Sequence, residues 1–234
     1  MDLKALAREL HADERAELLA HLLALGAEDR RLRFEYSMSD DGVRRYVEGI
    51  DFSHDAVFVV TDADLTIVGA AHLARKDRHA ELGVSVLSQS RGRGIGAALL
   101  ERSAARTRNW GIRVMFMNCL VENAAMMHLA RKQGLKIAVS GAEAEAFVHL
   151  PRADLTSLAA EVAVEHLGLF DHARNRIGWR YRVASRNETI FWDREDCLEL
   201  SSHGNSPCDS QFEKIAAMRI SRAGLFFTHS SWEM

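Results

Sequence analysis

The run Gln89-Ser90-Arg91-Gly92-Arg93-Gly94-Ile95-Gly96-Ala97-Ala98 decides how this chain folds. It follows a segment with strand alternation, residues 80–87, and precedes apolar residues at helical spacing. Its glycines permit positive φ and let the backbone approach a ligand closely. The helix that follows begins with unpaired N–H groups and partial positive charge, which suit an anion, and Arg91 and Arg93 add charged donors. Taken alone, such a run is more often a plain turn between a strand and a helix.

Outward from this run, periodicity predicts strands and helices in a definite order. Upstream we expect an amphipathic helix within residues 1–25 that stops at Gly26, a strand at 32–38, a helix of about 40–50 capped by Ser39, and a hairpin of strands 56–60 and 65–70. Downstream we expect a helix from Ile95, a strand at 114–118, a helix at 123–133, strands at 136–139 and 146–150, and a helix at 155–170. This order describes an α/β fold, a mixed sheet with helices on both faces.

Composition and charge exclude several classes of protein. Hydrophobic residues make up 47% and charged residues 27% of the 234, which is ordinary for a globular protein with a sizeable core. The net charge of −3, the scattered basic residues and a glycine run without aromatic residues argue against a nucleic-acid partner. There is no run of about 18 apolar residues to predict a membrane span.

Cellular location follows from the N-terminus and the cysteines. The opening Met1-Asp2-Leu3-Lys4 lacks the apolar core of a secretory signal. Three cysteines occur without metal-ligand spacing and cannot form a closed set of disulfides. We therefore expect a reduced, cytoplasmic protein with no metal, while the sequence carries no signal for its oligomeric state.

Two segments together resemble a known family. Arg91-x-x-Gly94-x-Gly96 resembles the Arg/Gln-x-x-Gly-x-Gly/Ala signature of the GNAT superfamily of N-acetyltransferases, and the strand that this fold requires precedes it. Residues 123–135 are similar to the second signature of that family, an Asn-led helix ending in Lys-x-Gly-Phe. The resemblance covers about residues 30–150 and implies a mixed, splayed sheet of six to seven strands.

The expected organisation has three parts. Residues 1–151 form the GNAT domain with its N-terminal helix, residues 152–180 a helical extension, and residues 181–234 a segment of unknown structure. A narrower resemblance is to the acetyltransferase domain of Pat-type bacterial protein lysine acetyltransferases. It rests on Arg31-Leu32-Arg33-Phe34, on the Ala80-Glu81 strand and on Glu122-Asn123-Ala124-Ala125-Met126-Met127. The large synthetase-like region often fused to those enzymes is absent from this chain.

The resemblance implies acetyl-CoA as acyl donor and assigns residues to its parts. Backbone groups of Val84 and Val86 would contact the pantetheine arm. The turn would hold the pyrophosphate, through Arg91, Gly92, Arg93, Gly94, Ile95, Gly96 and Ala97. Asn123 would hydrogen-bond the cofactor arm, although a simple helix N-cap explains the same residue and the two roles are compatible.

Acetyl transfer needs a neutral amine, and a carboxylate beside the acetyl group can accept the proton. Strand alternation places Glu81 with Ser85 on the face opposite Leu82 and Val84. The lysine acetyltransferases that this chain resembles use a glutamate at the matching position, so we expect Glu81 to be the general base. The alternative is an exposed or structurally paired glutamate on an ordinary strand.

The general acid is less evident. Many family members have a tyrosine four residues before the glycine that ends the second helix, and here that position is Ala130. His128 lies nearby but is more often a packed or solvated histidine, and Cys119 offers a less favoured covalent route. His72 and His79 are candidates for lining the acceptor cleft. Water is the remaining source of the proton.

The sequence therefore predicts acetyl transfer to a primary amine, in a protein lysine or a small molecule, by direct transfer in a ternary complex. The alternative is a CoA-binding regulatory protein with impaired catalysis, which the missing tyrosine favours and the retained Glu81 opposes.

Overall fold

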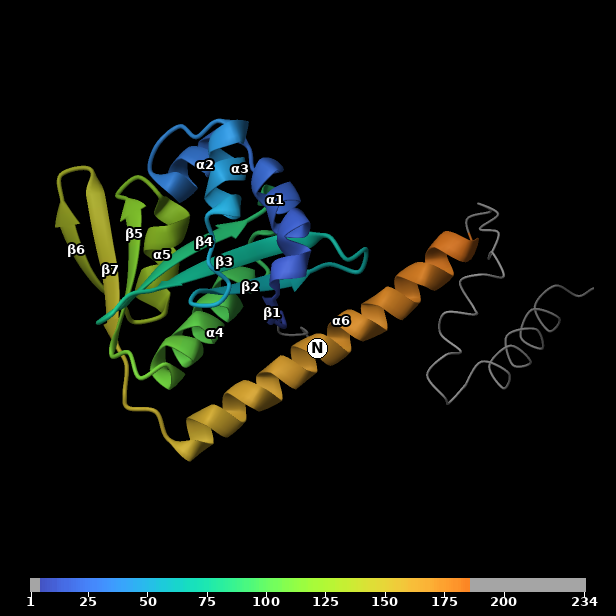
Figure 1. Ribbon diagram of the computed structural model, residues 1–234. Helices are drawn as coiled ribbons and strands as arrows, with labels where there is room; N and C mark the ends of the chain where they lie inside the picture. Colours follow the sequence, from blue (N-terminus) through green and yellow to red (C-terminus); the bar gives the residue numbers. More distant parts are fainter. Residues whose placement is uncertain (1–4, 186–234) are drawn as a thin grey trace, which may run out of the picture. The chain divides into compact units, whose positions relative to one another are not determined.

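The computed structural model describes residues 5–185, and their side chains as far as residue 177, and the fold is drawn in Figure 1. Within this part the sheet has seven strands in the order β1-β2-β3-β4-β5-β7-β6. Their bounds are β1 Arg8–Leu10, β2 Ala56–Thr61, β3 Ile67–Arg75, β4 Ala80–Val86, β5 Val114–Leu120, β6 Lys136–Ser140 and β7 Glu143–His149. All neighbours pair antiparallel except β4 and β5, which are parallel. The structure is the expected mixed α/β sheet.

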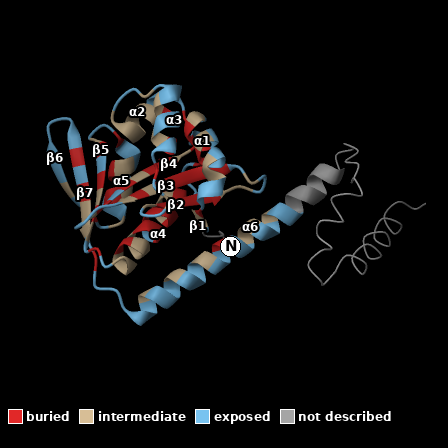
Figure 2. Ribbon diagram, viewed as in Figure 1, coloured by how far each residue is buried: buried red, intermediate tan, exposed pale blue. Residues whose placement is uncertain are grey.

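Helices cover both faces of this sheet (Figure 1). They are α1 Arg15–Leu23, α2 Ala27–Phe34, α3 Asp40–Glu48, α4 Ile95–Asn109, α5 Ala124–Lys132 and α6 Leu155–Ser185, with 3-10 turns at Ala12–Glu14 and Ser88–Ser90. In β2, Val57 and Val59 pack into the core under α1 and α3, whereas Phe58 packs into the core under α4. Neighbouring residues of a strand point to opposite faces of the sheet, and in the central strands both sets of residues are buried. These strands are therefore covered on both sides (Figure 2).

The sheet opens between β4 and β5. These seven-residue strands pair only at Ala80 with Met115 and at Glu81 with Phe116. Beyond Glu81 the two strands have no further paired positions, so their backbone groups face a gap rather than one another. The splay expected from the family resemblance is therefore confirmed, and it begins one residue after the proposed base.

Two expectations for the first forty residues were wrong. Residues 8–10 lie inside the expected N-terminal helix but form β1, antiparallel to β2, and helix begins only at Arg15. The expected strand at 32–38 is instead the end of α2, followed by Glu35 in the left-handed region at φ 68°. The alternation of Leu32 and Phe34 resembled a strand, but acidic residues in the first turn of α2 and arginines in its last turn favour a helix there.

Other local expectations were confirmed. Ser39 caps α3, because its hydroxyl accepts a hydrogen bond from the Gly42 N–H at 3.2 Å. The hairpin turns at Asp62, whose carboxylate accepts hydrogen bonds from the Asp64 and Thr66 N–H groups. The helix expected at 155–170 exists and continues to Ser185, and residues 186–234 of the C-terminal segment lie outside the described residues.

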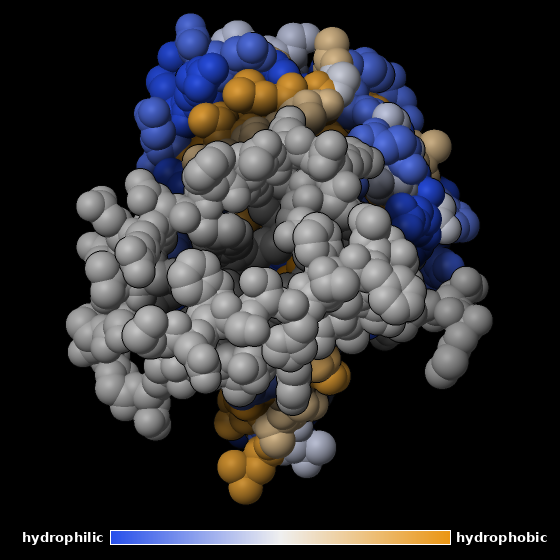
Figure 3. Space-filling view, turned by 90° about the vertical axis from the view of Figure 1, so that its right-hand side faces the viewer, coloured by the Kyte–Doolittle hydropathy of each residue, from blue (hydrophilic) through white to orange (hydrophobic). Residues whose placement is uncertain are grey.

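Helix α6 lies against α4 through buried ion pairs. The Arg102 side chain is 3% exposed and contacts Glu161 and Glu165, each at 2.7 Å. Arg106 joins Glu161 to Glu9 in β1. Elsewhere α6 exposes large apolar side chains, and Figure 3 shows apolar residues protruding at the lower end of the molecule, where α6 begins. Among the described helices, none is both long and apolar enough to cross a membrane.

Candidate active site

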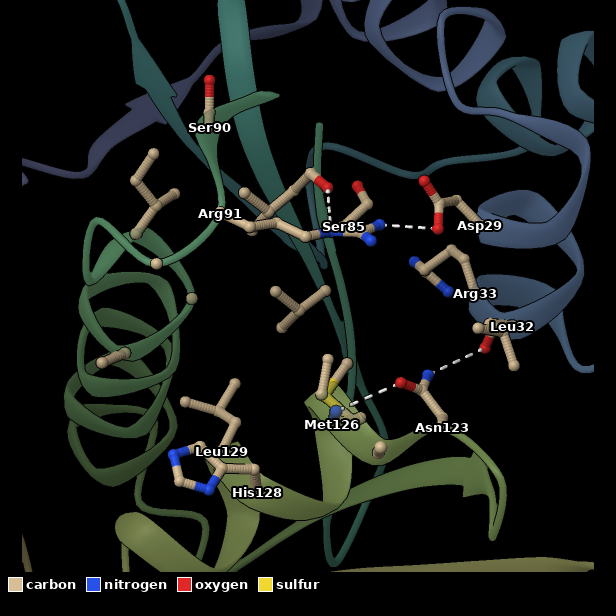
Figure 4. Close-up of a pocket in the computed structure, with 18 of the residues that line it drawn as sticks. Asp29, Leu32, Arg33, Ser85, Ser90, Arg91, Asn123, Met126, His128 and Leu129 are labelled. Carbon is tan, nitrogen blue, oxygen red and sulfur yellow. Dashed lines mark hydrogen bonds and ion pairs between the residues drawn. The ribbon is translucent and has the colours of Figure 1, made fainter. Parts of the chain in front are cut away.

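A cavity of about 620 Å³ lies where the sheet opens (Figure 4). Its walls come from four places in the chain: α2, the second half of β4, the glycine turn with the start of α4, and α5 with the residues just before it. The residues that line it on these elements include Asp29, Leu32, Arg33, Val84, Ser85, Val86, Arg91, Gly92, Gly94, Ile95, Gly96, Ala97, Asn123, Met126, His128, Leu129 and Lys132. Nearly all expected cofactor-binding residues are thus brought together in one place.

The glycine turn presents the start of α4 to this cavity. Gly92 and Gly94 both have φ of 76°, a conformation that a side chain disfavours. Gly94 is the N-cap of α4 and has no side chain to cap the helix, and the first intrahelical bond runs from the Ala98 N–H to the Gly94 carbonyl. The three preceding N–H groups are free of intrahelical partners and add to the positive end of the helix dipole. This end of the cavity suits an anion.

The two arginines of the turn differ in position. Arg91 extends across the cavity to the Asp29 carboxylate of α2 at 2.6 Å, as Figure 4 shows, so it ties the turn to α2. Arg93 is exposed and is not among the residues that line the cavity. Asp29 was not expected at the site, because nothing in the spacing of α2 connects it with a turn sixty residues later.

The wall formed by β4 has two different faces. Val84 is buried in the core under α4, whereas Ser85 points to the side of α1 and hydrogen-bonds the buried His21 Nε2 at 2.9 Å. His21 Nδ1 contacts the Ile67 carbonyl at 2.8 Å, so Nδ1 carries the proton and Nε2 accepts from the serine hydroxyl. Burial lowers the pKa of His21 to about 4, which keeps this histidine neutral and β4 fixed to α1.

Asn123 is the N-cap of α5 and also faces the cavity. Its side-chain oxygen accepts a hydrogen bond from the Met126 N–H at 3.1 Å, and its amide nitrogen donates to the Leu32 carbonyl at 3.5 Å. An ion pair of 2.8 Å between Arg31 and Glu122 makes a second connection between α2 and the start of α5. The capping role is therefore confirmed, and the Asn123 amide nitrogen has a second proton beyond the one that it donates to Leu32.

Glu81 lies outside the cavity, at the point where β4 and β5 cease to pair. Its side chain is half exposed, and its Oε1 is 3.2 Å from His79 Nε2, which therefore donates the hydrogen bond. The His79 ring packs edge-on against Phe116 at 5.2 Å, and this contact orients it. Of the two histidines considered for the acceptor cleft, His79 is the one beside Glu81.

The residues considered for protonating the leaving group, or for a covalent route, differ in their burial. Ala130 is fully buried in the core and bears no titratable group. His128 is exposed at the cavity wall. Cys119 is 1% exposed, its sulfur is 3.9 Å from that of Met127, and burial raises the pKa of its thiol. A covalent route through Cys119 finds no support in this geometry, because its thiol is inaccessible and is held in its unreactive protonated form.

A chain of four polar side chains, not foreseen from the sequence, ends at the cavity. The Arg33 guanidinium donates to the Tyr46 hydroxyl at 3.0 Å, that hydroxyl is 2.7 Å from His72 Nδ1, and His72 Nε2 is 3.1 Å from the Asp55 carboxylate. The carboxylate accepts from Nε2, so Nδ1 accepts from the tyrosine. Burial lowers the pKa of His72, even though the hydrogen bond to Asp55 opposes this, so the ring stays neutral at pH 7. The Arg31-Leu32-Arg33-Phe34 segment carries part of the family resemblance, but no spacing rule connects it with Tyr46 or His72.

These features fit coenzyme A. The uncapped helix start and the nearby Arg91 and Lys132 suit phosphate groups, and the unpaired edge of β4 beyond Glu81 offers backbone groups to an extended amide-bearing arm. Within the described residues, no group of three or more His, Cys, Asp or Glu side chains is placed to hold a metal ion.

The open α/β sheet is similar to those of several solved structures. The GNAT domain of S. lividans PAT superposes with a TM-score of 0.54 at 21% identity, over 62% of this chain and 89% of that one. A GNAT-family acetyltransferase from Streptococcus pneumoniae gives 0.51 at 16% identity over 63% and 100%, and a putative acetyltransferase from Acinetobacter baylyi gives 0.50 at 17% over 65% and 100%. At such identities the likeness is one of fold.

The family follows from the sequence itself. The model of the acetyltransferase (GNAT) family matches residues 19–135, and the chain belongs to that family. None of the curated proteins matches the chain significantly. The matched residues run from within α1 to just past the end of α5 and therefore include every wall of the cavity.

Proposed function

We propose that this protein transfers an acetyl group from acetyl-CoA to a primary amine within a ternary complex. The observation that carries the proposal is the cavity itself. It joins the uncapped start of α4 to the edge of β4 at the place where the sheet opens, and Glu81 lies at the end of that opening. Acetyl-CoA supplies the activated acyl group as a thioester.

The residues of the chain divide the work by position. The N–H groups at the start of α4 bind the pyrophosphate, and the backbone of Val84 and Val86 binds the pantetheine arm. Asn123 holds α5 and α2 together and directs its remaining amide proton into the cavity. The acyl group would then lie toward Glu81, because β4 leads from the turn to that residue.

Glu81 acts as the general base in this proposal. An alkyl amine is neutral in only about one molecule in a few thousand at pH 7, so its ammonium proton must be removed before attack. The half-exposed Glu81 carboxylate is reachable from solvent, and His79 holds it by one oxygen and leaves the other free. The acceptor is a protein lysine or a small amine, and a cytoplasmic location remains part of the proposal.

The second candidate is a CoA-binding regulator with impaired catalysis. The observation that favours it is Ala130, which fills the usual position of the acid with a buried methyl group. The two candidates differ in turnover but agree on binding.

Two measurements test the proposal. Isothermal titration with acetyl-CoA should show one binding site, and release of free thiol should be measured over a panel of small amines and lysine peptides. Binding together with thiol release that depends on the amine supports the enzyme. Binding without release on any acceptor supports the regulator, and absence of binding contradicts both.

A further inference from the structure

We propose that Arg33 stabilises the negative charge that develops on the CoA sulfur when the thioester breaks. This proposal rests on the proposed function and assigns the leaving-group end of the same site. Among the described residues, Arg33 is an arginine of the cavity wall that forms no ion pair with a carboxylate, whereas Arg91 is paired with Asp29.

Arg33 is seated on the backbone of β4. Its guanidinium lies directly over Gly83, where a Cβ atom would overlap it, so the absence of a side chain at this position makes room for the charge. Figure 4 shows the Arg33 side chain below that of Asp29, directed toward the cavity. Gly83 lies between Val84, which lines the cavity, and Glu81, which does not. The guanidinium is therefore at the end of the cavity nearest the proposed base.

The surroundings of Arg33 fix its position without cancelling its charge. Tyr46 accepts one hydrogen bond and presents its ring 5.7 Å from the guanidinium carbon, and Phe34 presents its ring at 4.9 Å. The buried Nε of Arg33 has no hydrogen-bond partner in the described part of the chain. A guanidinium has five N–H donors, so several remain for a ligand.

The titratable groups that face Arg33 come from several elements. His21 on α1 and His72 on β3 are both neutral, and the positive charge of Arg33 contributes to the lowered pKa of each. Burial and the charge of Glu143 raise the pKa of Glu35, which follows α2, and the positive charge of Arg33 opposes this rise. Arg33 thus has two neutral histidines and one carboxylate, Glu35, around it and forms no ion pair with that carboxylate, so its charge can attract an anion into the cavity.

The chemistry of transfer supplies such an anion. The amine nitrogen forms a bond to the acyl carbon and the carbon–sulfur bond breaks, leaving its electron pair on sulfur. The proton of the amine passes to Glu81 or to water. Arg33 keeps its own protons, since a guanidinium is always charged at neutral pH, and acts through charge and hydrogen bonds alone. Arg33 would thus stabilise the CoA thiolate, which Ala130 cannot protonate because it bears no titratable group.

The test measures the pKa of the thiol of bound CoA. Thiolate absorbance of the CoA complex is titrated against pH, with the complex of desulfo-CoA, which lacks the sulfur, as the blank for the protein's own cysteines. In the wild type the thiol should titrate at least about one pH unit below its value in Arg33→Gln, because a nearby positive charge favours the thiolate. Thermodynamic linkage predicts a second result. As the pH rises through the range in which the thiol titrates, the ratio of the affinity for CoA to that for desulfo-CoA should increase. This increase should be at least about tenfold larger in the wild type than in Arg33→Gln.

Two further variants test whether the shift in the thiol pKa depends on the charge and the position of Arg33. Arg91→Gln removes the arginine whose charge is already paired with Asp29, and should weaken CoA and desulfo-CoA equally, with the thiol pKa of the wild type. Tyr46→Phe keeps the ring but releases Arg33, and should give an intermediate thiol pKa.

Equal thiol pKa values in the wild type and Arg33→Gln would overturn the proposal. It would also be overturned if Arg33→Gln lost affinity selectively for CoA esters whose acyl group bears a carboxylate, such as succinyl-CoA. Binding of desulfo-CoA by the wild type shows in each case that the CoA site exists. Its absence would refute the proposed function instead.

Discussion

Gly94→Val separates the anion site of the glycine turn from the stability of the fold. Gly94 is the N-cap of α4 and has φ of 76°. A Cβ built at this position meets no atom within 4 Å, so the side chain itself has space. The damage comes from the backbone, because a branched residue must leave the left-handed region or bear its strain.

The strain and the lost binding have different sizes. Holding a non-glycine residue in the left-handed region costs about 1–2 kcal/mol, which for a chain of this size lowers Tm by roughly 2–8 °C. If the turn changes its conformation instead, the N–H groups at the start of α4 no longer point toward the pyrophosphate. Two charge-assisted hydrogen bonds are worth at least about 3 kcal/mol, so Kd for acetyl-CoA should rise more than about 100-fold.

Gly111→Val is the matched control. Gly111 follows the other end of α4 with φ of 79°, it has equal space for a Cβ, and it does not line the cavity. Its variant should lose a similar amount of stability while binding acetyl-CoA like the wild type. Thermal unfolding and isothermal titration on the three proteins give both quantities. If the Gly94 variant retained its affinity, or the Gly111 variant lost it equally, the pyrophosphate would bind elsewhere than at this turn.

Three other predictions concern the base, the α6 interface and the C-terminal residues. Glu81→Gln keeps shape but cannot accept a proton, so kcat should fall by roughly 10²-fold or more with acetyl-CoA affinity unchanged; similar rates in the thiol-release assay would make Glu81 structural. Although burial opposes it, hydrogen bonds from Asn109, Arg106 and Arg102 lower the pKa of Glu161. The contribution of the ionised Glu161 to the free energy of unfolding is therefore complete above the unfolded pKa of about 4.3, and it is lost as the pH falls through the lower folded pKa. Glu161→Gln should cost about 3 kcal/mol in urea unfolding at pH 7 and much less in acid, and a cost independent of pH would contradict the ion-pair account. Deletion of residues 186–234 should leave acetyl-CoA binding intact in titration calorimetry, since every cavity residue precedes residue 133, and loss of binding would give the deleted part a role in the site.

Local signals in the sequence were sufficient for several features of the site. The cap at Ser39, the cap at Asn123 and the turn at Asp62 each depend on hydrogen bonds that span two to four residues. The glycine turn belongs with them, because positive φ at Gly92 and Gly94 is a property of those residues alone. Such features can be read from the sequence since both partners lie in the same short window.

The tertiary structure decided the remainder. β1 is a strand only because β2 pairs with it, and its three residues are too few to show a period. Arg91 meets Asp29, and Arg33 covers Gly83, across gaps of about fifty residues or more. The sequence by itself determined the family, the turn and the caps, where the deciding forces are local. Only the folded chain placed the Arg33 cation over Gly83, two residues along β4 from the expected base, because burial and pairing between distant residues set the energy of such contacts, and no local propensity encodes them.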